Sequence, residues 1–248
     1  LLDKITIEEM PASSRRYPFV GFTPTREPGK DILAVNNISK AGEDGLPLLQ
    51  DVSFRLDKGD KVAFLSENPL AVTELFKIIM EESQPDAGAF KWGNTVSVSY
   101  FPKDNSPYFN DNDDNLVEWL RQYSPDPTET YLRGFLGRML FSGDEVFKAA
   151  KVLSGGERVR CMLSRMMLFG SNVLVLDQPT NHLDLESITA LNDGLRDFKG
   201  VVIFTSHDHE FIQTIANRII RLEENGVTDY RGTYDEFIES RRARGEHL

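Results

Sequence analysis

A serine followed by two glycines stands at the start of a stretch with helical spacing. Glycines that open a helix leave backbone N–H groups uncovered, and the positive end of the helix favours a bound anion. Ser154, Gly155 and Gly156 therefore form a candidate phosphate site, in which the Ser154 hydroxyl supplies a further donor. A glycine-rich turn with a serine N-cap has the same residues, so both interpretations stay open for this segment alone.

Two more polar residues follow apolar runs that are typical of buried strands. Asp177 ends the run 173–177, and His207 comes two residues after the run 201–205. An aspartate at the carboxyl end of a strand can hold Mg²⁺ through water beside bound phosphates. A histidine at the same edge can donate a hydrogen bond to a γ-phosphate. Together with the serine–glycine segment, these residues predict a nucleotide-phosphate site with a magnesium ion.

The elements expected to position these residues form an α/β fold. Continuous apolar runs are typical of parallel strands that are covered on both faces, and right-handed crossovers are expected between them. Such runs occur at 61–65, 173–177 and 201–205. A helical pattern from about residue 71 to 81 follows the first run. Shorter runs at 32–35 and 52–56 predict a mostly antiparallel β layer beside this core.

Two further regions are expected outside the sheets. Residues 1–33 contain several prolines and no sustained apolar period, which predicts a linker. The stretch from about 113 to 153 has apolar residues at helical spacing and is interpreted as a helical subdomain inserted in a domain that spans 34–248. Because the first residue is not methionine, we expect either a processed chain or a fragment and favour a fragment.

Composition limits the kinds of partner. The formal net charge is −11, which argues against this chain gripping a nucleic-acid backbone by itself. The sequence has no apolar run of about eighteen residues, so a membrane-spanning helix is not expected. The single cysteine, Cys161, fits a reducing compartment and a cytoplasmic location.

The motifs together resemble those of an ATP-binding cassette (ABC) ATPase. In that family's terms the signature lies at 153–157, the Walker B strand at 173–177, the D-loop at 181–184, and the switch histidine is His207. Two details are similar to the ABC-F family, in particular its YbiT-like branch. One is Glu157, where transporters usually carry glutamine, and the other is the run from Pro179 to Asp184.

The resemblance implies an ABC ATPase (P-loop) core that uses ATP and Mg²⁺. It places Thr73 and Asp177 at the metal. It also implies nucleotide contacts for the signature residues Ser154, Gly155, Gly156 and Glu157 and for Asp184 of the D-loop.

One motif of the family is degenerate here. The loop after the strand 61–65 should read G-x-x-x-x-G-K-S/T. Ser66 and Ala71 stand at the glycine positions, Val72 replaces the phosphate-binding lysine, and Thr73 keeps the hydroxyl. A hydrogen bond to a charged group contributes about 1.5–3 kcal/mol, so losing the lysine should weaken binding roughly ten- to a hundredfold.

Two other residues of this loop should weaken phosphate binding further. Pro69 lacks an N–H, and Glu67 adds negative charge where phosphates would lie. The alternative, that an unusual loop still cradles phosphate through Asn68 and Thr73, stays open.

Two other positions depart from the family pattern. Lys103 stands at the Q-loop position in place of glutamine, and Gln178 stands where the family carries its catalytic glutamate. An amide cannot accept the proton of an attacking water, so hydrolysis at this site should be severely reduced. Gln178 is either a natural substitution or an engineered one. Gln178 and His207 are the candidate catalytic residues.

Cassettes of this family act as head-to-tail pairs, in which each ATP lies between one Walker A loop and the partner's signature. The resemblance therefore implies a second, C-terminal cassette that lends an intact signature to the N-terminal half of the same protein. A ribosome-associated role in translation would follow, with RNA contacts outside this chain, and ATP hydrolysis is expected of the full pair. One alternative is a non-hydrolysing regulatory module. Another is the ATP-binding subunit of a transporter, although Glu157 and the D-loop sequence argue against it.

Overall fold

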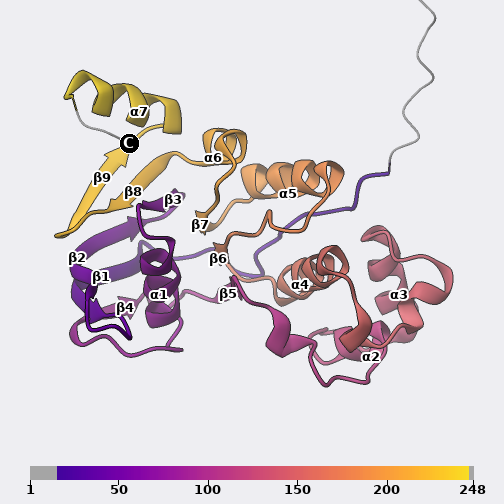
Figure 1. Cartoon of the computed structure of the whole chain (residues 1–248). Coiled ribbons are helices and arrows are strands. Elements are labelled where there is room, and N and C mark those ends of the chain that lie inside the picture. The colour runs from indigo at the N-terminus through magenta and orange to yellow at the C-terminus, as the bar shows by residue number, and fades with distance from the viewer. Residues whose placement is uncertain (1–15, 246–248) are drawn as a thin grey trace, which may run out of the picture.

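The computed structural model describes residues 16–245, which form two sheets with helices around them (Figure 1). Residues 1–15, the first part of the predicted linker, and residues 246–248 lie outside the described residues. Helix α1 (Pro69–Ile79) packs between the two sheets, because its apolar residues share one buried cluster with strands of both.

The larger sheet contains the three runs that were expected to be parallel strands. Its order is β5-β6-β7-β3-β8-β9, and all neighbours are parallel except β8 and β9. The strands are β3 (Lys61–Ser66), β5 (Val98–Phe101), β6 (Val173–Asp177), β7 (Val201–Thr205), β8 (Arg218–Leu222) and β9 (Val227–Arg231). The five parallel strands end at one edge, so the loops that follow them meet there.

The smaller sheet is antiparallel, in the order β2-β1-β4. Its strands are β1 (Asp31–Ala41), β2 (Pro47–Asp57) and β4 (Ala87–Trp92). Both long strands extend beyond the predicted runs 32–35 and 52–56. Asn37 and Asp51 have left-handed backbone, at φ 51° and 48°, where the register between the strands shifts. Such a bulge breaks the side-chain alternation without ending the strand, so the apolar pattern underestimates its length.

Helix α1 begins two residues before its predicted start. Asn68 caps it, because its side chain accepts a hydrogen bond from the Leu70 N–H at 3.0 Å, and Pro69 occupies the first turn. The other α-helices are α2 (Leu116–Arg121), α3 (Glu129–Arg138), α4 (Gly155–Phe169), α5 (Leu185–Asp197), α6 (His209–Ile215) and α7 (Tyr234–Ala243).

Helices α2 and α3 lie beside α4, away from the antiparallel sheet (Figure 1). They fall within residues 113–153, together with the short 3₁₀-helices Gly143–Phe147 and Ala150–Val152. The boundaries of a helical subdomain stay a prediction.

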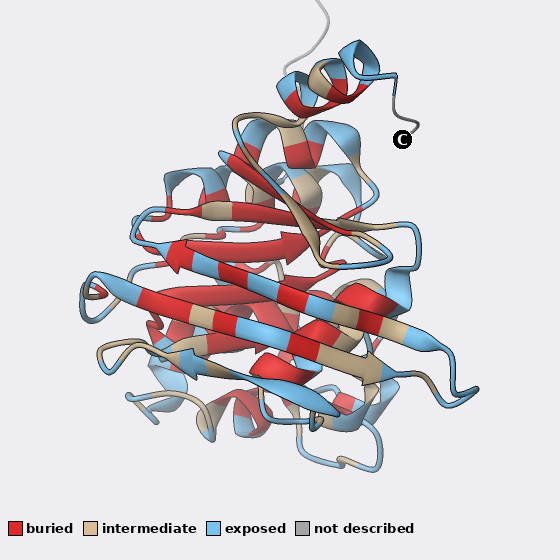
Figure 2. Ribbon diagram, turned by 90° about the vertical axis from the view of Figure 1, so that its left-hand side faces the viewer, coloured by how far each residue is buried: buried red, intermediate tan, exposed pale blue. Residues whose placement is uncertain are grey.

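Continuous apolar runs make sense because the larger sheet is covered on both faces. Along β6, Leu174 and Leu176 belong to the cluster on one face, while Val173 and Val175 belong to the cluster that α1 covers. Strands β6, β7 and β8 of this sheet are buried along their whole length, whereas buried and exposed residues alternate along the antiparallel strands (Figure 2). By the same alternation, Asp177 lies on the face that α1 covers.

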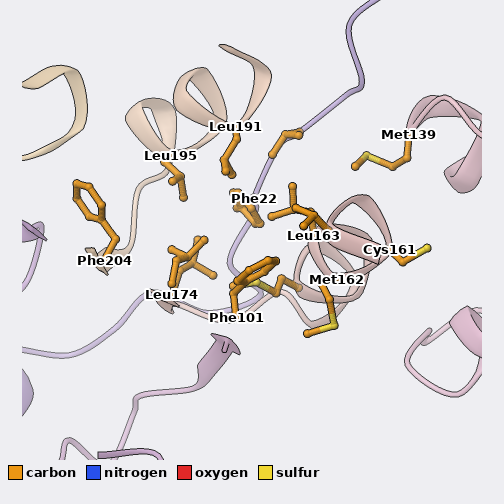
Figure 3. Packing of buried hydrophobic residues seen from close by; sticks show 14 of the residues in the cluster. Phe22, Phe101, Met139, Cys161, Met162, Leu163, Leu174, Leu191, Leu195 and Phe204 are labelled. Carbon is orange, nitrogen blue, oxygen red and sulfur yellow. The ribbon is translucent and has the colours of Figure 1, made fainter. Parts of the chain in front are cut away.

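Residues 16–30, called the strap below, run between α4 and α5 before β1 begins (Figure 1). Val20 and Phe22 are buried, and Phe22 lies among the core side chains that include Leu163 and Leu191 (Figure 3). The described part of the predicted linker therefore contributes to the core, which agrees with a docked segment. Whether it ends an interdomain linker stays a prediction.

Candidate functional site

The loops at the carboxyl edge of the larger sheet surround a cavity of about 270 Å³. Four of the predicted site residues line it, namely Ser66, Val72, Gln178 and His207. They come from the ends of β3, β6 and β7 and from α1. Side chains of α7 complete the wall, and most of the remaining lining is apolar: Phe64, Leu65, Pro69, Tyr234, Phe237 and Ile238.

Val72 makes the phosphate side of this cavity apolar. Its side chain is 2% exposed, belongs to the buried cluster under α1, and lines the site from the first turn of that helix. Arg221 is the cationic side chain that lines the cavity, but its Nη2 is 2.5 Å from the Glu67 carboxylate, and its Nε is 3.8 Å from Glu223. The guanidinium charge is therefore already compensated by carboxylates.

The other side of the same loop faces a wider and acidic cavity of about 860 Å³. Ser66, Asn68 and Ala71 line it, together with Glu67, Glu223 and Glu224. The Asn68 oxygen accepts from the Leu70 N–H, and the Asn68 N–H donates to Ser66 Oγ at 3.2 Å. The loop thus closes on its own polar groups. Among residues 16–245, its lining offers a phosphate three carboxylates, two of them paired with Arg221, and no cationic side chain.

Thr73 and Asp177 retain the features of a metal site. Within the described part of the chain, the Thr73 hydroxyl and both Asp177 carboxylate oxygens are buried without a hydrogen-bond partner that meets normal geometry. Burial raises the pKa of Asp177, while the nearby Thr73 hydroxyl and the Lys103 and Lys77 ammonium groups act in the opposite direction.

Mg²⁺ prefers such hard oxygen ligands and takes the rest from phosphates and water. These two residues therefore fit a magnesium ion that arrives with a nucleotide. Residues 16–245 contain no cluster of three or more His, Cys, Asp or Glu side chains that could hold a metal alone.

The structure places Lys103 near this carboxylate. Its exposed side chain follows β5, which pairs with β6 in the register Phe101 to Leu176, so the β5 loop leaves the sheet beside Asp177. A positive charge thus stands at the predicted Q-loop position.

Gln178 and His207, the two candidate catalytic residues, are in contact. Gln178 Nε2 lies 2.9 Å from His207 Nε2, and Asn181 Nδ2 donates to Gln178 Oε1 at 3.0 Å. Gln178 is 7% exposed and has φ 51°, a left-handed conformation that is uncommon for a residue with a side chain. The loop after Walker B is therefore tied directly to the loop after β7.

The signature segment lies outside the lining of either cavity. Ser154 is the N-cap of α4: its hydroxyl oxygen accepts from the Glu157 N–H at 3.3 Å, and the Glu157 carboxylate accepts from the Ser154 N–H at 2.8 Å. Lys148 Nζ also donates to Glu157 at 2.8 Å. Partial burial opposes the shift, but these hydrogen bonds hold the pKa of Glu157 down at about 2.

Glu157 thus has a local structural role that the sequence reasoning missed. The spacing S-x-x-E before an apolar run is a capping-box signal, and it would have identified this contact. Asp184 is likewise an N-cap, of α5, whose side chain accepts from the Ser187 N–H at 2.8 Å, and this contact lowers its pKa.

The two signature glycines lie close to a neighbouring residue of the D-loop. A Cβ atom on Gly155 would lie 3.1 Å from the His182 side chain, and one on Gly156 would lie 3.0 Å from the His182 carbonyl oxygen. The D-loop therefore packs closely against the start of α4, and a side chain at either glycine would require His182 to shift. Because the capping box uses the Ser154 and Glu157 N–H groups, the Gly155 and Gly156 N–H groups are the ones that this helix start can offer a ligand.

Comparison with known proteins agrees with this geometry. A family described as "ABC transporter" matches residues 49–181. The chain is 62% identical to "Uncharacterized ABC transporter ATP-binding protein YkpA" of Bacillus subtilis (strain 168), over 97% of this chain and 44% of the relative. It is 38% identical to "Probable ATP-binding protein YbiT" of Escherichia coli O157:H7, over 97% of this chain and 45% of the relative. The chain thus spans less than half the length of these curated relatives.

A relative with a named role is more distant. "Energy-dependent translational throttle protein EttA" of Escherichia coli (strain K12) is 33% identical over 86% of this chain and 39% of that protein. "ABC transporter F family member 5" of Arabidopsis thaliana is 32% identical over 91% of this chain and 32% of that protein.

Solved structures support the fold. A structure described as the dimeric post-hydrolysis state of the ATP-binding cassette MJ0796 bound to ADP and Pi has a TM-score of 0.65 at 17% identity, covering 81% of this chain and 98% of that one. The predicted ABC ATPase fold with an antiparallel β layer is therefore confirmed. No helix among residues 16–245 is long and apolar enough to cross a membrane.

Proposed function

Because this chain belongs to the ABC transporter family, we propose that it is the second cassette of an ABC-F type ATPase and lends its signature to a partner cassette. In this proposal the partner is the N-terminal half of the same protein. Two findings support it: the chain covers less than half of the curated relatives YkpA and YbiT, and some matched proteins are named as F family members.

The observation that carries the proposal is an asymmetry between two parts of the chain. The signature is intact and outward-facing, with Ser154, Gly155 and Gly156 at the open start of α4. The chain's own loop is apolar at Val72 and surrounded by carboxylates. A cassette that has lost its own phosphate cradle but kept its signature is suited to complete a site on another cassette.

Each retained residue has a defined task in such a pair. ATP with Mg²⁺, bound by the partner, supplies the phosphoryl group that is transferred to water. The Ser154 hydroxyl and the N–H groups that follow would donate hydrogen bonds to its terminal phosphate, where the helix dipole favours negative charge. In this chain's own site Gln178 lacks a basic group that could accept a proton from water, so hydrolysis there is severely reduced.

Exposed apolar side chains support a partner surface on the same loops. Leu70 of the degenerate loop is 61% exposed, Val152 before the signature is 64% exposed, and Leu185 after the D-loop is 67% exposed. Burying leucine and valine side chains against a partner lowers the free energy of the complex. All three stand next to motifs that face the partner in the proposed pair.

A translation-related role in the cytoplasm is part of the proposal. It is supported by the similarity to a protein named as a translational throttle. With a net charge of −11, this chain offers little attraction to RNA phosphates, so ribosome contacts would come from other parts of the protein.

Calorimetric titration of this chain with Mg-ATP tests whether its own degenerate phosphate-binding loop has lost the ability to bind nucleotide. A variant with Ser66→Gly, Pro69→Gly, Ala71→Gly and Val72→Lys restores the glycines and the lysine. We expect undetectable binding to the unaltered chain and micromolar binding to the variant, since each lost charged hydrogen bond weakens binding about ten- to a hundredfold.

The control carries the same three glycines with Val72→Met, which fills the space without a charge and should stay weak. Micromolar binding of Mg-ATP to the unaltered chain would contradict the proposed loss of nucleotide binding at its own loop. This chain would then be a regulatory module that holds a nucleotide without hydrolysing it. Gln178, which replaces the catalytic glutamate, favours this alternative.

A further inference from the structure

Three side chains at the edge of the cavity form one hydrogen-bonded chain, from Asn181 through Gln178 to His207. Asn181 Nδ2 donates to Gln178 Oε1 at 3.0 Å, and Gln178 Nε2 lies 2.9 Å from His207 Nε2. Gln178 itself is only 7% exposed, whereas its two partners, Asn181 and His207, are exposed. Both ends of the buried amide are thus occupied by the protein.

The backbone holds the amide in this position. Gln178 has φ 51°, its N–H donates to the Thr205 carbonyl oxygen at 3.1 Å, and its carbonyl oxygen accepts from the Asn181 N–H at 3.3 Å. The hydroxyls of Thr180 and Ser206, 3.2 Å apart, join the same two loops. A left-handed backbone is costly for a non-glycine residue and persists where the surroundings fix it. The Gln178 side chain is therefore a fixed part of the site.

We propose that Gln178 holds His207 as the neutral tautomer that carries its proton on Nδ1. The Gln178 oxygen faces Asn181, so the amide nitrogen faces the ring, and an amide nitrogen can only donate. His207 Nε2 must then accept, which leaves the ring proton on Nδ1. Glutamate in place of Gln178 has the opposite effect, because a carboxylate only accepts and requires an N–H on Nε2.

This tautomer changes what the switch histidine offers a nucleotide. An ionised phosphate accepts hydrogen bonds, so it gains nothing from an Nε2 that is itself an acceptor. His207 can donate from Nε2 only after it releases Gln178 and exchanges its proton. Gln178 is in this respect a positioning residue for His207. The consequence for phosphate rests on the proposed function, whereas the tautomer does not.

Nitrogen-15 NMR of the histidine rings reads the tautomer directly. The spectra are taken at about pH 8.5, roughly two units above the ordinary histidine pKa, and the His207 signals are assigned by their loss in His207→Asn. We expect at least a tenfold excess of the Nδ1–H form in the unaltered chain, since the other form would set two donors against each other. Gln178→Glu should reverse the ratio in favour of Nε2–H.

A second variant tests the orientation of the amide without changing Gln178. In Asn181→Asp the carboxylate can only accept, so Gln178 must turn its nitrogen toward residue 181 and its oxygen toward His207. The tautomer should shift to Nε2–H, as in Gln178→Glu. His209, whose Nε2 lies 2.7 Å from Asp235, serves as the internal reference and should keep its ring signals.

An Nε2–H form in the unaltered chain, or one tautomer shared by all three proteins, overturns the proposal. The dispersion of the remaining resonances shows whether each variant is folded. The spectra need no nucleotide, so a negative result here is separate from a negative result in the calorimetric test.

Discussion

Asp177 is fully buried, and neither of its carboxylate oxygens has a hydrogen-bond partner of normal geometry in the described part of the chain. Burial raises its pKa, so the folded chain holds this proton more tightly than the unfolded chain does. Ionised Asp177 therefore lowers stability at neutral pH. We expect Asp177→Asn to raise the free energy of unfolding by about 1–3 kcal/mol at pH 7, measured by urea unfolding.

The pH dependence gives this prediction its sign. The penalty begins above the ordinary aspartate pKa of 3.8 and is complete above the raised pKa of the folded chain. The advantage of Asp177→Asn should therefore shrink as the pH falls and vanish near 3.8. Asp114→Asn, at an exposed position, should change stability by less than about 0.5 kcal/mol. An Asp177→Asn chain that is less stable than the unaltered chain at pH 7 would contradict this account.

The positions of the site residues could be predicted from the sequence better than their contacts. Because continuous apolar runs indicate buried strands, the sequence alone places Asp177 and His207 at or just beyond strand ends. The pairing of Arg221 with Glu67 spans 154 positions and gives no local signal. The contact of Gln178 with His207 depends on a left-handed backbone conformation at residue 178, which cannot be predicted from the presence of a glutamine there.

At the scale of elements, the strap packs against α5 at Gly194. A Cβ atom on Gly194 would lie 2.7 Å from the Val20 carbonyl oxygen, which is backbone and cannot easily move. Gly→Ala in a helix interior normally stabilises by about 0.5–1 kcal/mol. Here we expect Gly194→Ala to lower the free energy of unfolding by about 1–3 kcal/mol, because the strap must shift.

A second helical glycine provides the matched control. Gly134 lies in α3, and a Cβ atom there would meet no described atom within 4 Å. Gly134→Ala should therefore stabilise the chain by about 0.5–1 kcal/mol. Urea unfolding of both variants separates helix propensity from strap docking. Stabilisation by both substitutions would mean that the strap does not pack on α5 in solution.

The strap also shows where sequence reading at this scale falls short. Its prolines and the lack of an apolar period correctly indicate a segment without regular helix or strand. The burial of Val20 and Phe22 could not be predicted from the sequence, because two apolar residues are too few to form a periodic pattern. The docking contacts are remote in sequence, such as the Gly21 N–H to Met167 Sδ at 3.2 Å, which spans 146 positions.

At the scale of the whole molecule, the proposed function makes the two nucleotide sites of a pair unequal. The site built on the partner's loop would use this chain's signature, and the site built on this chain's loop would lack the lysine and a basic group that could accept a proton from water. This division requires the partner to carry an intact lysine in its own phosphate-binding loop. A partner without that lysine would leave the pair with no competent site and would exclude the proposal.

Ser154 allows the donated half to be tested without damaging the fold. Asparagine and aspartate cap a helix about as well as serine, so Ser154→Asn and Ser154→Asp should both keep α4. Only the aspartate places a negative charge where the partner's phosphate would lie. In the two-cassette protein we expect Ser154→Asp to lower kcat/KM for ATP at least about tenfold below Ser154→Asn, measured by steady-state phosphate release. Equal rates for the two variants would mean that no phosphate approaches Ser154, and that this cassette does not work by lending its signature.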